Sequence, residues 1–447
     1  MTEQRFVQAD ALLVGVAAVD LAQDGRSDPN DPAYVKAVVF RQGGQQAALV
    51  ICDLIGVSGE LSPRARESAA REGGMPVEHI CLSATHTHSN PDRPDDLVER
   101  IAQAVVEAQA AVRPVKLMVG NGHRDDISFN RRYLMRDGTV MMNPGQLNPD
   151  IVRPVGPIDP EIGIVLFRNA DDGKPYASLT SFASHCCSFK WDAQHNKDPY
   201  DRRADYAYWL ERSLREEFGP DFVSVFGEGF CEDIGEIDVN RPHAYKKVTR
   251  GQFMLIDYVP LETTASPDPS NSKYVGEALA DEIKAQVPKL REDHPALAVR
   301  QQVIRVPLGM YSDMDLEWAK SADYQAVSWL TQFRIDRILD LDKLRKRYGE
   351  TLPVNVQVIR LGEETAIAAL PGQLMVELGL ALKQASPFAD TLAIELANED
   401  EYIALVPPRK SFCEGHFEVI HSLLECGGGE MMVDAAVRLL RELKTAD

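Results

Sequence analysis

The feature that most constrains the fold is a short apolar run that ends abruptly in histidines. Residues Ile80 to Ala84 favour a β-strand, and the chain continues as Thr85-His86-Thr87-His88-Ser89. Prolines follow, and then an amphipathic stretch at 95–112 that is typical of a helix. A strand, a polar turn and a helix in this order indicate an α/β fold, in which ligands bind at the carboxyl ends of strands.

The spacing of the two histidines favours a site at this strand end. On extended backbone, residues two apart lie on the same side, so the imidazoles of His86 and His88 face one way. A single histidine near a strand end is more often a hydrogen-bonded core or surface residue. Five consecutive polar side chains cannot continue a buried strand, however, and we interpret the run as a candidate site.

The remaining pattern predicts a mixed, partly parallel sheet covered by helices, with the site at strand ends. Strand-like runs alternate with helical ones in the first part of the chain, which requires some parallel pairing. By length alone the chain could hold roughly two or three domains, but we expect one unit over residues 1–447. Strands are expected at 11–19, 35–41, 47–55, 78–84, 116–120, 162–167, 177–183, 222–226, 299–308, 354–361, 365–370 and 392–396, and helices at 62–71, 95–112, 272–290, 314–347 and 430–444.

A second histidine ends another strand-like run. Residues Ala177 to Ala183 lead into Ser184-His185-Cys186-Cys187. The adjacent cysteines lack the spacing of a zinc site, so His185 is the ligand candidate and the cysteines are expected to pack. Asp53, at the end of the 47–55 strand, could lie beside His86, and a turn or helix-capping role is equally consistent.

Two polar segments contain further candidate residues. The section 129–160 shows little periodicity and is predicted to fold over the sheet as a binding loop, in which Arg131 and Arg132 either grip a substrate oxygen or form surface ion pairs. The segment 227–238 holds five carboxylates. Such a cluster is either a solvated loop or a pocket in which crowding raises the pKa of one acid toward the range of a general base.

Charge and cysteine content narrow the functional class. The chain has 48 Lys and Arg against 68 Asp and Glu, a net charge of -20, which disfavours nucleic acid and anionic membranes as partners. No signal-like or membrane-spanning run is visible. Seven cysteines without CxxC pairs indicate reduced thiols. We expect a cytoplasmic protein that acts on a small molecule, and the sequence is compatible with a homo-oligomer.

Seven motifs in order resemble the neutral/alkaline (non-lysosomal) ceramidase family, in its N-terminal catalytic domain. The resemblance spans roughly residues 50 to 440. The matching pieces are Ala84-Thr-His-Thr-His-Ser89, Asn130-Arg131, Asp159-Pro-Glu161, Ser181-Phe-Ala-Ser-His185, Gly229-Phe-Cys-Glu-Asp233, Leu370-Pro-Gly-Gln373, and Val406-Pro-Pro-Arg409 followed by His416-Phe-Glu418.

The resemblance implies a zinc hydrolase that cleaves an amide. Family members hold one zinc ion with two histidines, a glutamate and a tyrosine. The two histidines correspond to His86 and His185. His88 is then the neighbouring acid/base or orienting residue, and Arg131 lies on the substrate side.

Three positions depart from the family pattern. The family glutamate is Gln373 here, the family tyrosine falls on Leu405, and the active-site serine falls on Gly235. Ceramide is therefore not the expected substrate. Either the metal is lost, or other groups complete its shell; the candidates are Asp53, Asp233, Glu377 and His416.

These observations together predict a zinc-dependent hydrolase of a small polar substrate, an amide in preference to an ester. Asp233, or else Glu236, would be the general base, His88 would support the oxyanion, and Arg131 and Gln373 would bind substrate. Two alternatives stay open. One is a catalytically silent ligand-binding protein, and the other is a lyase or isomerase acting on a sugar-like substrate.

Overall fold

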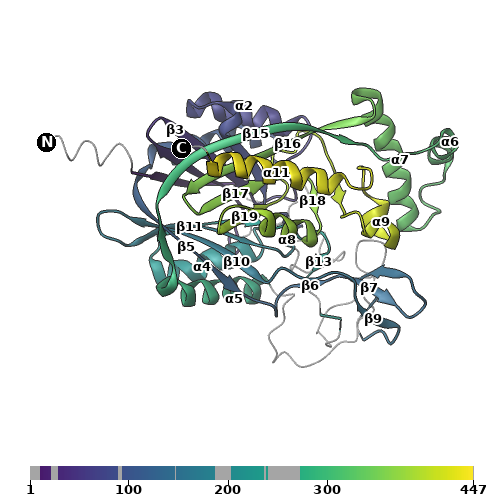
Figure 1. Cartoon of the computed structure of the whole chain (residues 1–447), viewed down its shortest axis with the longest axis horizontal. Coiled ribbons are helices and arrows are strands. Elements are labelled where there is room, and N and C mark those ends of the chain that lie inside the picture. The colour runs from purple at the N-terminus through teal and green to yellow at the C-terminus, as the bar shows by residue number, and fades with distance from the viewer. Residues whose placement is uncertain are drawn as a thin grey trace.

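A computed structural model describes residues 11–21, 29–88, 93–145, 147–186, 203–235, 238–239 and 272–445. The predicted mixed α/β architecture is confirmed, and it takes the form of two sheets packed face to face with helices on both outer faces (Figure 1). The expectation of a single unit over residues 1–447 stays a prediction.

The larger sheet is nine-stranded and runs in the order β12-β11-β10-β5-β1-β2-β3-β4, with β14 paired to β5. Only β3·β4 and β11·β12 are parallel within it; the other pairs are antiparallel. The strands are β1 (Leu13–Asp20), β2 (Tyr34–Gln42), β3 (Gln45–Cys52), β4 (Ile80–Ala84), β5 (Arg113–His123), β10 (Glu161–Asn169), β11 (Pro175–Phe182), β12 (Val223–Glu228) and β14 (Arg291–Asp293).

The smaller sheet has four strands in the order β15-β16-β17-β19. Its strands are β15 (Pro295–Pro307), β16 (Thr351–Gly362), β17 (Thr365–Ala369) and β19 (Asp390–Ile394). The strands expected at 354–361 and 365–370 correspond to β16 and β17, which pair as an antiparallel hairpin, and β19 pairs in parallel with β17.

The alternation of side chains along each strand makes this layering possible. In β17, Ile367 and Ala369 pack against the larger sheet, whereas Ala366 and Ala368 face the helices on the other side. Successive side chains on a strand point to opposite faces, so a strand that is apolar throughout can serve two cores. The two sheets therefore share one apolar interface.

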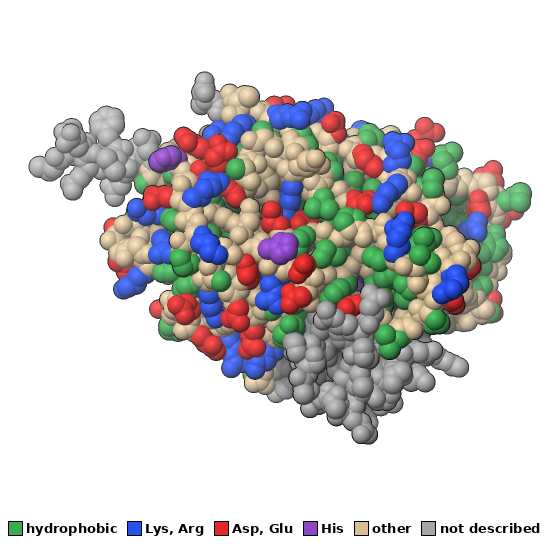
Figure 2. Space-filling model, turned by 60° about the horizontal axis from the view of Figure 1, so that its bottom comes forward, with side chains coloured by type: hydrophobic (Ala, Val, Ile, Leu, Met, Phe, Trp, Pro, Cys, Tyr) green, Lys and Arg blue, Asp and Glu red, His purple; other side chains and the backbone are tan. Residues whose placement is uncertain are grey.

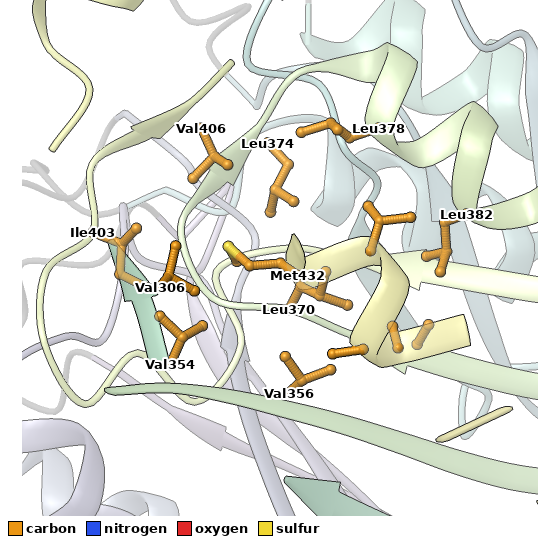
Figure 3. Packing of buried hydrophobic residues seen from close by; sticks show 14 of the residues in the cluster. Val306, Val354, Val356, Leu370, Leu374, Leu378, Leu382, Ile403, Val406 and Met432 are labelled. Atoms are coloured by element: carbon orange, nitrogen blue, oxygen red, sulfur yellow. The ribbon is translucent and has the colours of Figure 1, made fainter. Parts of the chain in front are cut away.

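Helices close both outer faces. The larger sheet is covered by α2 (Leu61–Gly73), α3 (Leu97–Ala110), α4 (Tyr206–Phe218) and α5 (Ser272–Gln286), which is followed by a short 3-10 turn, η2 (Val287–Lys289). The smaller sheet is covered by α7 (Trp329–Tyr348), α8 (Val376–Ala385) and α11 (Gly428–Thr445). Figure 3 shows Leu378 and Leu382 of α8, Met432 of α11, and Val354 and Val356 of β16, which belong to one apolar cluster with Met432 near its centre.

The remaining elements are short or peripheral. They are η1 (Val77–His79), β13 (Ile234–Gly235), which pairs with β6 (Phe129–Asn130), β18 (Gln373–Leu374), which pairs with β20 (Leu405–Val406), α6 (Asp313–Ser321), α9 (Ser411–Glu414) and α10 (Phe417–Ile420). The segment 314–347, predicted to be helical, forms α6 and most of α7, at the right in Figure 1.

The prediction of an irregular loop at 129–160 was wrong in part. This section contains a three-stranded antiparallel sheet of β7 (Arg132–Met135), β8 (Val140–Met142) and β9 (Ile151–Pro154). Its strands are too short to show a period in the sequence. They are held by a turn at Asp137-Gly138, where Gly138 has a positive φ, and by a small apolar cluster around Tyr133.

The larger sheet curls so that its two ends approach each other. Although β4 and β12 end the strand order at opposite sides, Lys36 on β2 donates a hydrogen bond to the Ser224 carbonyl on β12 (3.0 Å). The segment after β19 joins the ends further, because Glu395 donates its backbone N–H to Glu228 (3.1 Å) and Asn398 donates to Leu82 (2.7 Å). The carboxyl ends of β4 and β11 therefore come together.

The surface agrees with a net charge spread along the chain. On the face shown in Figure 2, acidic and basic side chains are interspersed. Within the described residues no helix is long and apolar enough to cross a membrane. The six described cysteines are free thiols, in line with the predicted reduced state, and Cys187 lies outside the described residues.

Candidate metal centre

His86 is placed by the parallel pairing of β3 and β4. Cys52 and Ala84 are partners in that register, and the Thr85 amide continues it by donating to the Cys52 carbonyl (2.9 Å). The backbone then turns sharply at His86, whose φ is +58°, a left-handed conformation that is uncommon outside glycine and often occurs at functional sites. Nδ1 of His86 lies 2.7 Å from the Ile55 carbonyl oxygen. A carbonyl can only accept, so Nδ1 carries the hydrogen and Nε2 is left with a free lone pair.

His88 and His185 complete a cluster with His86. The His88 amide donates to the Cys186 carbonyl (3.1 Å), which fixes the end of β4 to the end of β11. The Nε2 atoms of His86 and His88 are 3.2 Å apart, and the His185 ring centroid is 5.0 Å from that of His86. One ligand atom from each of the three lies within 4.8 Å of the others. The sequence-predicted meeting of His86 and His185 at the strand ends is therefore present.

The three imidazole rings are uncharged, which is the protonation state that binds a metal ion. Burial lowers the pKa of His86 to about 4, and burial holds the pKa values of His88 and His185 well below their usual range, with the charge of Arg131 adding to the effect. All three rings are therefore neutral near pH 7, and neutral imidazole nitrogens are good ligands for zinc and related cations.

The separation of the ring nitrogens also fits a metal ion. Two nitrogen ligands of one tetrahedral zinc ion, each at about 2.0–2.1 Å, lie about 3.3 Å apart. The Nε2 atoms of His86 and His88 are separated by 3.2 Å. The donor set and its spacing therefore suit zinc without rearrangement of these two rings.

Arg131 and Glu232 lie beside the cluster. A guanidinium N–H of Arg131 donates to Oε1 of Glu232, and Arg131 also approaches Glu418 (3.5 Å). The other Glu232 oxygen, Oε2, lies 3.9 Å from Nε2 of His185 and makes no hydrogen bond among the described residues. Burial raises the pKa of Glu232 to about 8, although Arg131 opposes this shift.

Arg132, the other candidate substrate-binding arginine, instead holds parts of the fold together. It is 1% exposed and donates to Glu414, Glu418, Ser411 and the Gly415 carbonyl, which ties β7 to α9 and α10. A buried arginine with this many partners is committed to the fold. Of the two, Arg131 alone is next to the histidines.

Two buried glutamates, Glu228 and Glu395, lie near His185 and Cys231. Nδ1 of His185 lies 3.6 Å from the Cys231 thiol, and that thiol donates to Glu395 (3.4 Å). Glu228 lies within the same group and is fully buried, as is Glu395. Burial and the proximity of other carboxylates raise the pKa values of both glutamates well above their usual range.

Among the described residues, no contact joins Asp233, the first predicted general base, to the three histidines. Asp233 accepts hydrogen bonds from the Val376 amide (2.8 Å) and from the Asn130 side chain (2.7 Å), so both of its oxygens hold neighbouring segments in place. Glu236 lies outside the described residues. The catalytic role of either acid stays a prediction.

Gln373 and Leu405, which stand where the resemblance places a metal-binding glutamate and tyrosine, are register partners on neighbouring strands. Gln373 on β18 pairs with Leu405 on β20, and Leu405 is 2% exposed and packs with Met142 and Phe417. Leu405 is therefore part of an apolar cluster. Gly235 lies on β13, opposite Phe129.

The other proposed replacement ligands have partners elsewhere. Asp53 accepts the Tyr34 amide (2.8 Å), so its side chain joins the end of β3 to the start of β2 and forms neither the turn nor the helix cap considered from the sequence. Glu377 pairs with Lys410 (2.5 Å), and His416 accepts the Met142 amide (3.2 Å). Among the described residues, neither these three side chains nor Asp233 belongs to a metal-ligating group.

Sequence reasoning overlooked Glu232 as an individual residue. The carboxylate-rich segment was recognised, but Asp233 and Glu236 were the acids selected from it. The apolar neighbours Phe230 and Cys231, which are 1% and 0% exposed, were the available signal that this part of the segment is buried. A glutamate inside a buried run needs a charged partner or a bound cation.

Comparison with known proteins points to one group. No protein family model matches the chain. In sequence it is 24% identical over 244 residues to the neutral ceramidase of Pseudomonas aeruginosa, a match that covers 50% of this chain and 34% of that protein. The matched region thus spans about a third of the length of the curated relative.

Two solved structures share the fold. A ceramidase complexed with C2 has a TM-score of 0.66 at 17% identity, covering 97% of this chain and 75% of its own. The crystal structure of the neutral ceramidase from Pseudomonas aeruginosa has a TM-score of 0.64 at 18% identity, covering 98% and 75%. The sequence match and the shared fold together make this chain a divergent relative of the neutral ceramidases.

Proposed function

We propose that the protein is a zinc-dependent hydrolase of a small polar substrate, and that the bond it cleaves is an amide in preference to an ester. The observation that carries this proposal is the convergence of three neutral histidines, two buried and one half-buried, at the joined ends of β4 and β11. Kinship with ceramidases supports hydrolysis of a C–N bond. Zinc, when bound, supplies a Lewis acid that polarises a carbonyl group and lowers the pKa of water.

The residues of the chain have separate parts in this proposal. His86 and His185 would hold the metal, and the Ile55 carbonyl and Cys231 orient their rings. Arg131 brings positive charge next to the cluster, where it would favour a substrate oxygen that gains negative charge. Because both Asp233 oxygens are occupied, the proposal stands on the histidines and Arg131.

The substrate is proposed to differ from ceramide. The positions of two family ligands are Gln373 and a buried Leu405 that packs in an apolar cluster. The net charge of -20 favours a neutral or cationic small molecule over nucleic acid or an anionic membrane. We also propose a cytoplasmic location.

The test is a hydrolysis assay on a panel of small N-acyl compounds and matched esters, in water enriched in oxygen-18. The proposal predicts release of a carboxylic acid that carries one labelled oxygen, with loss of turnover by at least 100-fold in His86→Ala and His185→Ala. His123→Ala is the control, because His123 is largely exposed and lies away from the cluster. Turnover that incorporates no labelled oxygen would instead indicate a lyase or isomerase.

A second candidate function is supported by the same loss of ligands. A protein that keeps the fold but only binds a ligand would tolerate Leu405 and Gly235 at former catalytic positions. It would take up no zinc at the histidines and would turn over none of the panel. Metal analysis of the purified protein separates the two.

A further inference from the structure

We propose that His88 and Glu232 complete the metal shell, so that this chain holds its metal with three histidines and one glutamate. This inference rests on the proposed function, and it assigns two side chains to the places left by Gln373 and Leu405. Four observations lead to it.

The first observation is the contact between His88 and His86. Nε2 of His86 has no hydrogen, because Nδ1 is the atom that donates to the Ile55 carbonyl. The Nε2 atom of His88 faces it at 3.2 Å. Either a hydrogen on Nε2 of His88 or a cation therefore lies between the two nitrogens, and a cation shared with His185 satisfies all three rings at once.

The second observation is the unused oxygen of Glu232. This side chain is 1% exposed, and Oε2 makes no hydrogen bond among the described residues although it lies 3.9 Å from Nε2 of His185. A buried carboxylate oxygen without a partner is costly. A shift of roughly 0.6 Å toward His185 brings this oxygen to the separation of about 3.3 Å expected for two ligands of one zinc ion. Glu232 does not belong to the three-histidine group, so its side chain must also move toward His86 and His88 when the metal binds.

The third observation is that Glu232 is already oriented. Arg131 donates to Oε1 and so directs Oε2 toward His185. Metal-binding carboxylates are commonly held in this way by a hydrogen bond to their second oxygen. Arg131 is therefore a positioning residue for Glu232 in this arrangement.

The fourth observation concerns where Glu232 enters the site. Its amide donates to the Leu374 carbonyl (3.0 Å), which fixes its backbone beside β18, the strand that carries Gln373. Glu232 therefore lies next to Gln373, the position at which the resembling family has its glutamate ligand. Four protein ligands match the number in the family, with a different composition.

The experiment is zinc affinity by competition with a chromophoric chelator, on the full chain, together with the visible absorption of the Co²⁺-substituted protein. His88→Ala and Glu232→Gln are each expected to weaken zinc binding by at least 10-fold and to change the cobalt spectrum, because a ligand is lost. Glu377→Gln and His416→Asn are the matched controls, and both are expected to keep wild-type affinity.

A second variant, in which a glutamate is reintroduced at a neighbouring position, tests whether the loss of zinc affinity comes from the lost ligand or from a disturbed fold. In Glu232→Gln combined with Gln373→Glu, an acid returns on the neighbouring strand, and recovery of affinity supports the replacement. If His88→Ala or Glu232→Gln retains both wild-type zinc affinity and the wild-type cobalt spectrum, the proposed shell is wrong. A wild-type protein that binds no zinc at all would instead overturn the proposed function.

Discussion

At the scale of single residues, the interior of this protein contains several acids that are costly to ionise. Glu399 is one that lies outside the metal cluster. It is 2% exposed, and burial raises its pKa to about 7, although its side chain accepts the Ile403 amide (2.9 Å). Because folding raises its pKa, Glu399 makes the folded state less stable as pH rises.

The pKa of Glu399 predicts how a Glu399→Gln variant responds to pH. The folded state binds the Glu399 proton more tightly than the unfolded state, so the contribution of Glu399 to stability falls as pH rises from about 4.5 to about 7 and changes little above that. Glutamine does not ionise, and it can still accept from Ile403. Relative to wild type, the variant should therefore gain up to about 3 kcal/mol between pH 4.5 and pH 8.

Urea unfolding of both proteins at pH 4.5 and pH 8 checks this expectation. A stability difference that does not change between the two pH values would contradict it. The comparison is made with chelator present, so that metal binding does not contribute.

Asp233 allows a test between a structural and a catalytic role. In Asp233→Asn, one oxygen becomes an NH₂ group that faces either the Val376 amide or the Asn130 side chain, both of which are donors in the wild type. Unfolding free energy should fall by about 1–3 kcal/mol. Asp171→Asn, in the exposed turn between β10 and β11, should change it by less than about 0.5 kcal/mol. Loss of turnover with unchanged stability would restore the general-base role.

At the scale of elements, the position of the helices depends on close contacts that only glycine permits. Gly15 on β1 faces α3, and a Cβ atom there would lie 1.9 Å from the Ala108 carbonyl oxygen. Helix α3 therefore rests directly on the strand, which fixes the helical layer next to β4.

Gly15→Ala should force strand and helix apart and destabilise the protein by at least about 1–3 kcal/mol. Gly44→Ala is the control, since nothing lies within 4 Å of the added atom, and it should range from neutral to about 1 kcal/mol more stable. Chemical denaturation of the two variants measures both. Equal stabilities for the pair would show that the contact with α3 is unimportant.

Most elements could be predicted from the sequence, because long strands and helices carry their own periodicity. The run Ile162 to Phe167 and the hairpin at 354–370 gave clear signals, since apolar side chains continue over many residues. The short strands β7 to β9 did not, because three or four residues cannot display a period. Their pairing is decided by Gly138 and by tertiary contacts around Tyr133.

At the scale of the whole molecule, the site depends on the curl of the larger sheet, which local sequence patterns do not reveal. The sequence indicated that His86 and His185 each end a strand, and the strand ends were expected to meet. It did not show that β4 and β12 stand at opposite ends of a nine-stranded order, or that the sheet curls until they approach. For the same reason the closeness of Glu232 to His185 could be recognised only in three dimensions.

A metal that joins the ends of β4 and β11 should stabilise the whole fold. Ligand at 100 times its dissociation constant stabilises the folded state by about 2.7 kcal/mol, so EDTA should lower the melting temperature of the zinc-loaded protein by several degrees. The His86→Ala/His185→Ala double variant should melt at the same temperature with and without EDTA. An equal EDTA effect in that variant would place the stabilising metal elsewhere.

The most direct measurement is an anomalous difference map from crystals grown with zinc, with data collected on both sides of the zinc absorption edge. A single strong peak is expected about 2.0–2.1 Å from the Nε2 atoms of both His86 and His185. If zinc-saturated crystals show no peak between these two rings, the histidines do not form a metal centre, and the protein is not the zinc hydrolase proposed above.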